Sequence, residues 1–591
     1  MTTTLVSPIQ KGGAWLFDAL TQENVFTPDR MTDEHRLIDQ TALEFVTKEI
    51  APNHDQLETK DWDLARRLLR RAGDLGLLGT DVPEAYGGVP LDKVSAAIIA
   101  NRIGQGGSFG SVFGAQTGLV VMPIYTFGTA EQKERYLPSL VTGETVGAYC
   151  LSESGSGSDA LGAKTRAVRQ DDDSYILNGE KMWITNGGFA DLFIVFAKVD
   201  GEHFTAFIVE RGFDGVTSGP EERKMGLFGS STTSVILQDV RVPAANLLGE
   251  VGRGHKVAFN VLNYGRFKLG ASAVGSCKLA LGESARYASE RQQFGQPICN
   301  FGAIKHKLGE MVARTYAIES MVFRTAGLLD AMLSDNESTD DNAMLTALEE
   351  YAIESSIVKV TGSEYLHYVL DENVQIHGGN GFVKDYPAER HYRDSRVNRI
   401  FEGTNEINRL LIPGMLVRRG LQGHFPLVAA VKKLQDEILS PIQTSNPDSG
   451  PLEKQYAAVT MFKKVSLATL GLAMQSYGEK LTDQQEVLSF VSDILMDTYA
   501  SESVVLRAQR AAATTTATSK LHEDTAALFV NDAANRVDVA AKAAVAAMTE
   551  GDTRRTHLAA LRRLLKVSPV NTVALRRSLA DAAVQQAGYT F

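Results

Sequence analysis

Residues 399–409 read RIFEGTNEINR, and this stretch says more about the chain than any other. Glu402 follows an apolar Ile-Phe pair and precedes Gly403, which lets the backbone turn sharply. Thr404 is typical of an N-cap, so we expect a short helix that begins there and ends at Pro413-Gly414. A carboxylate against apolar neighbours has a raised pKa and can act as a general base. Such an acid can also merely stabilise the helix dipole, and the stretch alone favours that second interpretation.

The stretch lies in one of two regions with helical periodicity, and a region of a different kind separates the two. Residues 256–411 and residues 30–145 repeat apolar side chains at spacings of three and four. Residues 146–255 instead contain short runs rich in β-branched and aromatic residues, such as LFIVFAKV and FTAFIVE. Three dipeptides predict hairpins or tight turns between these runs: Asn178-Gly179, Asn186-Gly187 and Asp200-Gly201. The order helical, β, helical is the first conclusion about the fold.

More helix is expected after these three regions. Residues 440–450, SPIQTSNPDSG, predict an exposed linker, and residues 451–585 are helical and rich in alanine. The chain should therefore be mainly α with a central β domain. The predicted domains are an N-terminal helical domain (30–145), a β-barrel or sandwich (146–255), a C-terminal helical bundle that carries Glu402 (256–415) and an additional helical domain (420–591).

Composition excludes several classes of protein. The 591 residues carry a net charge of −11, which argues against a nucleic-acid partner. The three cysteines, Cys150, Cys277 and Cys299, have neither metal-ligand nor disulfide spacing, so we expect no metal site and a reducing compartment. No apolar run looks long enough to span a bilayer, and the N-terminus lacks the features of a secretory signal or a mitochondrial presequence. A cytoplasmic location is expected.

Two segments of the β region carry residues suited to a polar ring. Residues 150–160 read CLSESGSGSDA, where glycines and small polar residues leave backbone N–H groups free to face an anion or a ring. The glycines do not follow the dinucleotide-binding fingerprint, so a nicotinamide site is not expected. Residues 181–188 read KMWITNGG, and regular strand alternation places Trp183 and Thr185 on one face, as an aromatic wall beside a hydroxyl donor. A solvent loop and a core tryptophan are the plain alternatives.

Two further segments lie in the helical region. Residues 291–295, RQQFG, end a long amphipathic helix with Arg291, whose planar fork suits a phosphate. Residues 375–382, QIHGGNGF, form a glycine-dense turn where backbone can approach a ligand closely. His377 in this turn is expected to be structural rather than catalytic.

The order and spacing of these segments resemble the acyl-CoA dehydrogenase family of flavoenzymes over residues 30–415. The C-terminal extension resembles that of the very-long-chain branch and of its relative in respiratory complex I assembly. In this family FAD takes a hydride from the β-carbon of an acyl-CoA, and a glutamate takes the α-proton. The resemblance therefore makes Glu402 the base, with the substrate carbonyl polarised by the N–H of that residue and by a ribityl hydroxyl of FAD.

The resemblance also implies the binding residues. Arg266 and Gly403 would contact the acyl-CoA, and residues 109–116 would lie near the part of the pocket that sets chain length. Arg291, Phe294, Gln375, Gly378 and Gly379 would reach the FAD of a neighbouring subunit, so oligomerisation would be part of cofactor binding. The cofactor contacts within the chain would be Ser152, Ser158, Trp183, Thr185, Thr404 and Glu406.

The expected activity is the oxidation of medium to very-long-chain acyl-CoA to trans-2-enoyl-CoA in fatty-acid β-oxidation, with electrons passed to an electron-transfer flavoprotein. An acyl-CoA oxidase that uses oxygen is the alternative enzyme, and a respiratory-complex assembly factor with secondary catalysis is the alternative of another class. A homodimer is expected. The extension's polar stretch, SPIQTSNPDSGPLEK, argues against membrane association, although peripheral binding at the inner face of the membrane stays open.

Overall fold

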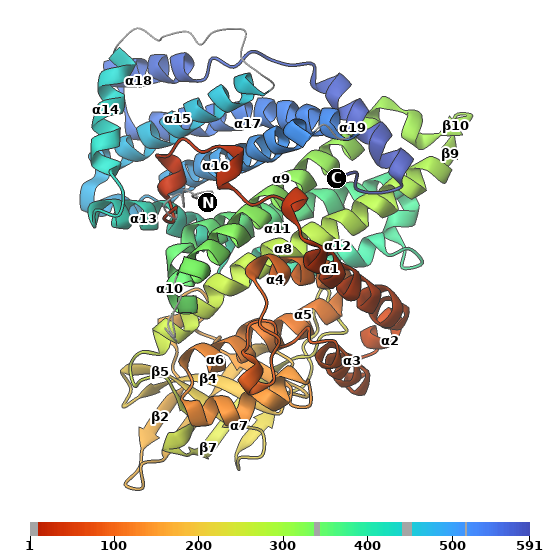
Figure 1. Cartoon of the computed structure of the whole chain (residues 1–591). Helices are drawn as coiled ribbons and strands as arrows, with labels where there is room; N and C mark the ends of the chain where they lie inside the picture. The colour runs from red at the N-terminus through yellow and green to blue at the C-terminus, as the bar shows by residue number, and fades with distance from the viewer. Residues whose placement is uncertain (1–9, 336–342, 440–451, 515–516) are drawn as a thin grey trace, which may run out of the picture.

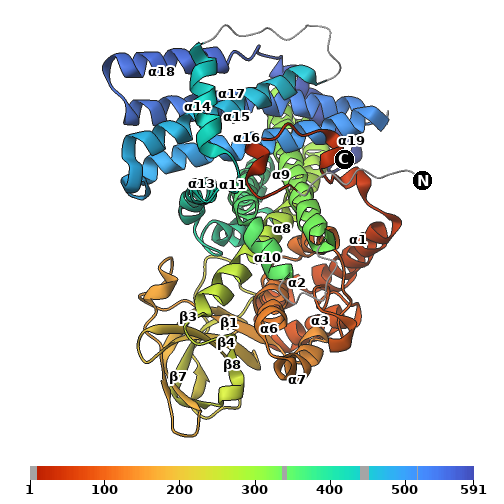
Figure 2. The same cartoon turned by 60° about the vertical axis from the view of Figure 1, so that its left-hand side comes forward.

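The β-sheet lies at one end of the molecule and the C-terminal helices lie at the other (Figures 1 and 2). Between them run the long helices α8 (Gly254–Glu290) and α9 (Gly302–Asp335). The computed structural model describes residues 10–335, 343–439, 452–514 and 517–591, and the predicted linker at residues 440–450 lies outside them. The predicted order of helical, β and helical regions, followed by further helix, is confirmed.

The N-terminal helices connect the sheet to the bundle, because α4 packs against α8 while α7 packs against residues of the sheet. Short polar caps start several of them: Asp61 accepts from the N–H of Leu64, and Asp92 accepts from that of Ser95. A π-helical stretch, residues 115–121, continues α5 into α6. These helices are α1 (Asp33–Phe45), α2 (His54–Glu58), α3 (Trp62–Asp74), α4 (Lys93–Ile103), α5 (Ser108–Gly114), α6 (Met122–Phe127) and α7 (Ala130–Val141).

The β domain is one eight-stranded sheet with the order β6-β7-β3-β2-β4-β5-β8, in which β1 also pairs with β4. Both faces of β4 are buried, because Ile194 packs toward α6 and α7 while Val195 packs toward α3 and α5. The strands are β1 (Gly147–Cys150), β2 (Arg166–Arg169), β3 (Tyr175–Thr185), β4 (Leu192–Val199), β5 (His203–Glu210), β6 (Val216–Ser218), β7 (Thr232–Val242) and β8 (Leu247–Leu248).

Two of the three predicted turns are present in the sheet. Asp200 and Gly201 join β4 to β5 with φ of 52° and 80°, as a tight hairpin requires, and residues 186–189 form a turn after β3. The turn predicted at Asn178-Gly179 is wrong, because β3 runs straight through it. The register with β7 shifts between Leu177 and Gly179, so the dipeptide marks a bulge instead.

The helical bundle after the sheet is built on α8 and α11. Helix α11 (Ala352–His377) lies along α8, and the two helices come close at Gly270 and Gly362: a Cβ on Gly362 would lie 3.2 Å from the Cα of Gly270. The remaining helices of the bundle are α10 (Ala343–Glu350), α12 (Ala388–Ser395) and α13 (Asn405–Leu421). A small hairpin, β9 (Gln292–Gln293) and β10 (Gln296–Pro297), follows the end of α8.

The C-terminal region adds a helical layer on the side of the bundle away from the sheet (Figure 1). Helices α15, α16 and α17 pack against one another, and α16 also contacts α9 and α13. Helix α19 returns to α9 and ends near its middle, where Tyr589 donates to Glu319 over 2.8 Å. These helices are α14 (Leu427–Leu439), α15 (Glu453–Tyr477), α16 (Gln485–Thr514), α17 (Ser519–Met548), α18 (Gly551–Leu564) and α19 (Thr572–Gln586).

Helix α13 begins where the sequence places it but does not end there. The hydroxyl of Thr404 accepts from the N–H of Ile407 over 3.2 Å, so the predicted N-cap is confirmed. The predicted end at Pro413-Gly414 is wrong, because the helix continues to Leu421. Pro413 lacks an N–H, which leaves the carbonyl of Arg409 without its helical donor. The hydroxyl of Ser492 on α16 donates to that carbonyl instead.

One stretch of the described residues, Glu453–Asp483, is long and apolar enough to cross a membrane by length and composition. The expectation that the chain has no such run is therefore wrong. Within this stretch, 61% of the most apolar window of 18 residues is buried inside the protein. Helix α15, which forms most of the stretch, packs against neighbouring helices. That burial is a sufficient reason for its apolar composition.

The segment before α1 ties the C-terminal region to the bundle. The N–H of Gly13 and the indole N–H of Trp15 both donate to the buried carboxylate of Glu354 on α11, over 2.7 and 3.0 Å. From the other side, Lys463 on α15 donates to the carbonyl of Asp18 over 2.7 Å. This segment therefore lies between α11 and α15 and holds both.

Candidate active site

Glu402 lies in the short loop between α12 and α13, with the backbone in the left-handed region. Its φ is 58° and that of Gly403 is 77°. A non-glycine residue in this region stores strain of order 1–3 kcal/mol, and such residues concentrate at functional sites. The loop leads straight into the N-cap Thr404, so the carboxylate is carried by the start of a fixed helix.

The carboxylate of Glu402 faces α8 and lines a cavity. Its Oε2 is buried and has no hydrogen-bond partner among the described residues. The approach to α8 depends on Gly265, because a Cβ at that position would lie 2.7 Å from Oε2. Burial raises the pKa of Glu402 to about 7, although Arg266 and Lys359 oppose that rise. The predicted base thus has an unpartnered oxygen and a pKa near neutrality.

Three side chains hold the backbone beside this carboxylate. Arg266 Nε donates to the carbonyl of Glu402 over 3.0 Å, and Lys359 Nζ donates to that of Gly403 over 2.7 Å. Asn408 Nδ2 also donates to the Gly403 carbonyl, over 2.9 Å. The described contacts of Arg266 therefore position the base, and its predicted contact with an acyl-CoA stays a prediction.

The cavity beside Glu402 is bounded by α4, by α5 with the π-helical stretch, by one face of α8 and by α11 and α12. Thr185, at the end of β3, lies in the same wall, so the sheet and the bundle meet at this cavity. Most of the lining is apolar or glycine. Lining residues include Leu77, Ile99, Ile103, Gly110, Phe113, Gly114, Gly118, Leu269, Leu366 and Phe401.

Trp183 and Thr185 lie on the accessible side of β3, but not by regular alternation. The pairing with β7 is irregular between Lys181 and Ile184, and Trp183 has φ of 57°. The bulge turns the indole outward, where it is 58% exposed, while Ile184 is buried. The predicted contact of this exposed indole with a flavin stays a prediction.

The loop at residues 151–160 reaches β3 next to this indole. The carbonyl of Ser152 accepts from the N–H of Met182 over 2.9 Å, which places Ser152 beside Trp183. Ser158 is exposed farther along the loop. A Cβ on Gly155 or Gly157 would meet nothing within 4 Å, so the main chain of the loop is open to its surroundings at these two glycines.

The remaining predicted cofactor residues form a second cluster at the other end of α8. Arg291 caps α8, Phe294 is 93% exposed, and Gln375, Gly378 and Gly379 are exposed at the end of α11. The ends of these two helices are joined, because the rings of Tyr287 and His377 stack at 4.2 Å. A buried ring contact of this kind is the structural role predicted for His377.

These two clusters are too far apart to hold one flavin within one chain. Gly265, beside Glu402, and Glu290, beside Arg291, are on the same helix and 25 residues apart, or about 37 Å at 1.5 Å per residue. Open backbone at Gly378 and Gly379, where a Cβ would meet nothing within 4 Å, fits a polar cofactor from another subunit. The residues present therefore suit a cofactor shared between two chains.

Thr404, Gly403 and Glu406 accompany the base at the start of α13. Thr404 uses its hydroxyl as the N-cap. Gly403 has its carbonyl occupied by Lys359 and Asn408. Glu406 is exposed in the first turn, where an acid stabilises the helix N-terminus. Their contacts with cofactor or substrate stay predictions.

Sequence reasoning missed three residues of this site. Lys359 and Gly265 carry no motif, because only the packing of α11 and α8 brings them to Glu402. Tyr149 on β1 has a hydroxyl that finds no hydrogen-bond partner in the part of the chain that the structure describes. Burial, and then the charge of Glu402, raise its pKa well above the usual value, which places the phenol near the base.

Replacing Gly265 by alanine tests the geometry of the carboxylate. The added methyl group would push Oε2 away, and a misplacement of about 1 Å costs about a hundredfold in rate, so flavin reduction by acyl-CoA should slow by ~10². Gly282→Ala on the same helix is the control, because its methyl would meet the flexible end of Arg286 at 3.2 Å and the carbonyl oxygen of Ala587 at an ordinary contact distance of 3.5 Å. Stopped-flow absorbance measures both. Equal rates in the two variants would contradict the assigned contact.

Known proteins match this chain along its length. Family models for the acyl-CoA dehydrogenase N-terminal, middle and C-terminal domains match residues 32–144, 148–240 and 252–415. A further model, also described as an acyl-CoA dehydrogenase C-terminal domain, matches residues 461–563. The very long-chain specific acyl-CoA dehydrogenase of Homo sapiens mitochondria is 43% identical over 350 residues, which are 57% of this chain and 51% of that protein.

Two bacterial proteins match almost all of the chain. A probable acyl-CoA dehydrogenase of Bacillus subtilis (strain 168) is 46% identical over 587 residues, 98% of this chain and 99% of that protein. The crystal structure of an acyl-CoA dehydrogenase complexed with FAD from Bacillus anthracis has a TM-score of 0.96 and 48% identity, and the match covers 98% of this chain and 100% of that one. The chain belongs to the acyl-CoA dehydrogenase family, whose members are FAD-dependent oxidoreductases.

Proposed function

We propose that this chain oxidises medium to very-long-chain acyl-CoA to trans-2-enoyl-CoA in fatty-acid β-oxidation, with Glu402 as the base. The observation that carries the proposal is the free Oε2 of Glu402, buried at the wall of a largely apolar cavity. An unpaired carboxylate oxygen in such a place has no structural purpose that we can name. It is suited to receive a proton from the α-carbon of a bound thioester.

The residues around Glu402 prepare it for this step. The α-proton moves to Oε2, the electron pair of that C–H bond becomes the new double bond, and the β-hydrogen leaves as hydride. FAD, when bound, supplies the acceptor for that hydride. Arg266 and Lys359 hold the carbonyls of residues 402 and 403, so the backbone that carries the carboxylate stays in place beside α8. Apolar walls exclude water, which would otherwise compete for the base.

Glu402→Gln should keep FAD and lose turnover by about 10³-fold, because an amide cannot accept the proton. In the unmodified enzyme the rate of flavin reduction should rise with pH and reach half its maximum near pH 7, since the raised pKa of Glu402 is about 7 and only the carboxylate is active. Anaerobic stopped-flow reduction between pH 5.5 and 9 measures this. A Gln variant with nearly normal reduction would show that another group is the base.

A stripe of glycines supports long acyl substrates. Gly110, Gly114 and Gly118 recur at every fourth position of α5 and its continuation, so they share one face, and all three line the cavity. At Gly114 and Gly118 an added Cβ would meet nothing within 4 Å. The wall is thus bare of side chains, which leaves room for an acyl chain.

Gly114→Phe should shift the preference toward short chains. If the ring excludes about four methylenes of the substrate from the cavity, at about 0.8 kcal/mol each, kcat/KM for the C16 substrate should fall by ~10². That for C6 should change little. A panel of C4 to C20 acyl-CoAs with the unmodified chain, Gly114→Ala and Gly114→Phe measures the shift. A uniform loss across all lengths would refute the assignment of this wall to the acyl chain.

An electron-transfer flavoprotein is the proposed electron acceptor, as the family resemblance implies. The exposed indole of Trp183 marks the surface at which a redox partner could approach the flavin. Two chains would share each FAD, which makes a homodimer the smallest active form. We propose a cytoplasmic location, with peripheral binding at the inner face of the membrane as the alternative.

Reoxidation separates a dehydrogenase from an oxidase. Enzyme reduced anaerobically with palmitoyl-CoA should pass its electrons quickly to an added electron-transfer flavoprotein and only slowly to oxygen. Flavin absorbance and peroxide assays follow the two routes. Rapid peroxide formation on mixing with air would favour the oxidase instead. Turnover with either acceptor that depends on Glu402 would argue against a purely structural role.

A further inference from the structure

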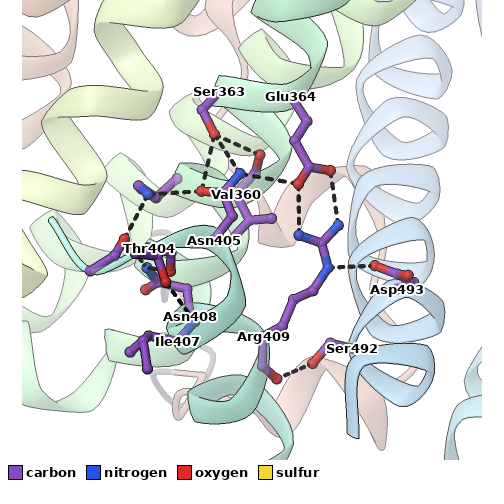
Figure 3. A network of polar contacts seen from close by, with 12 residues as sticks. Val360, Ser363, Glu364, Thr404, Asn405, Ile407, Asn408, Arg409, Ser492 and Asp493 are labelled. Carbon is purple, nitrogen blue, oxygen red and sulfur yellow. Dashed lines mark hydrogen bonds and ion pairs between the residues drawn. The ribbon is translucent and has the colours of Figure 1, made fainter. Parts of the chain in front are cut away.

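The C-terminal region touches the helix that carries the base at two consecutive residues. Ser492 on α16 donates to the main-chain carbonyl of Arg409 on α13. The next residue, Asp493, accepts from Arg409 Nε over 2.8 Å. Figure 3 shows both contacts meeting α13 from the same side. One residue of α13 is thus held by main chain and side chain at once.

Arg409 also binds a carboxylate of the bundle. Its Nη1 and Nη2 donate to the two oxygens of Glu364 on α11, over 2.6 and 2.9 Å. Burial alone would raise the pKa of Glu364, but the hydrogen bonds and charge of Arg409 lower it overall. A two-pronged pair of this kind fixes direction as well as distance, so Arg409 links α16, α13 and α11 rigidly.

The contacts continue from Glu364 toward the base (Figure 3). Asn405 Nδ2 donates to Glu364 Oε1 over 3.0 Å. Asn405 Oδ1 accepts from Lys359 Nζ over 2.8 Å, and the same ammonium group donates to the carbonyl of Gly403. The chain of contacts therefore runs from Asp493 to the residue next to Glu402 without a gap.

We propose that Ser492 and Asp493 are positioning residues for the acyl-CoA dehydrogenase reaction, through which the C-terminal region holds α13 and keeps Glu402 aimed into the cavity. This inference rests on the proposed role of Glu402 as the base. It gives the C-terminal region a part in catalysis, although none of its residues lines the cavity among those described.

Pro413 explains why α13 needs outside support. A proline inside a helix removes one hydrogen bond and favours a kink. The carbonyl left free belongs to Arg409, and it is the one that Ser492 reaches. Since Ser492 is fully buried, its removal would leave that carbonyl without a donor in a place that excludes water. The helix would then bend at its middle and shift its first turn.

A rescue experiment tests the role of Ser492. Ser492→Ala should lower kcat by about tenfold, as a small misplacement of the base does, and leave KM within about twofold. Pro413→Ala restores the N–H that can bond the Arg409 carbonyl, so the double variant Ser492→Ala/Pro413→Ala should recover most of the lost kcat. A double variant no faster than Ser492→Ala would overturn the assignment of Ser492.

Asp493 has a matched control in the same region. Asp493→Ala removes an ion pair whose carboxylate side chain is 41% exposed. Glu437→Ala removes another pair, to Lys464, whose carboxylate side chain has the same exposure and for which the described residues show no hydrogen bond or ion pair to α13. Both should change the melting temperature little, because such pairs contribute about 0–1 kcal/mol. Only Asp493→Ala should lower kcat, by about threefold to tenfold. Equal kcat in the two variants would overturn the proposal for Asp493.

The pH profile separates positioning from loss of fold. Arg266 on α8 and Lys359 on α11 lower the pKa of Glu402, and the charge of Glu402 in turn raises the pKa of Tyr149 on β1. Lys268 on α8 and His391 and Asp394 on α12 also line the cavity. Burial lowers the pKa of Lys359 itself to about 7, so this side chain carries its full charge only on the acid side of the profile. If α13 shifts, Lys359 loses its hold on Gly403, and the charge that it carries there moves away from the base.

In Asp493→Ala, the pH at which the rate of flavin reduction reaches half its maximum should then rise. In Glu437→Ala this pH should stay the same. FAD content and melting temperature, measured on each variant, exclude simple unfolding, and an unchanged half-maximal pH in Asp493→Ala would contradict the proposal.

The outcome also distinguishes this inference from the assignment of the base. If Glu402→Gln loses turnover while Ser492→Ala and Asp493→Ala behave like the control, the base stands and the positioning role fails. If Glu402→Gln stays active, the base is misassigned, and any loss in the two C-terminal variants then has another cause.

Discussion

The site depends on one constraint: a carboxylate with a free oxygen must stay in an apolar cavity. Burial raises the pKa of Glu402, and no described residue forms a hydrogen bond with its Oε2. Its side chain therefore cannot be fixed through its own reactive atom. The structure fixes the backbone instead, through Arg266, Lys359 and Asn408, and removes every obstacle on α8 by placing a glycine at 265. Strain at φ 58° is part of the cost of this arrangement.

The length of α8 imposes the second constraint. Gly265, which lies against Glu402, is in the first half of this helix. The exposed cluster that includes Arg291 and Phe294 follows its C-terminal end. We propose that one FAD does not bridge the distance along this helix within a single chain, so that two chains complete each cofactor site. The C-terminal layer then reinforces the same bundle from outside, and the N-terminal segment ties that layer to α11 through Glu354. The C-terminal helices, the bundle and the helix that follows Glu402 are consequently connected by direct contacts.

Much of the fold could be predicted because periodicity is a local property. The succession of helix, strand and helix was correct, as were the N-cap at Thr404 and the hairpin at Asp200-Gly201. Local rules failed where tertiary contacts compensate for a local defect. The helix passes Pro413 because Ser492 replaces the missing donor, and β3 passes Asn178-Gly179 because β7 accommodates a bulge. The stretch Glu453–Asp483 is long and apolar enough to cross a membrane, but it contains Lys463 and Lys464, and packing buries much of it inside the protein.

The sequence by itself determined the chemical groups: a glutamate before a capped helix, an aromatic residue and a hydroxyl at the end of a strand, and bare glycine segments. These groups follow from the types of residue and their spacing, and both are given by the linear sequence. Only the tertiary structure decided what surrounds them. The pKa of Glu402 near neutrality, its contact with Gly265, its support by Lys359 and the reach of Asp493 to Arg409 all join residues far apart in the chain. Burial and charge act through space, so they become readable only once the helices are packed.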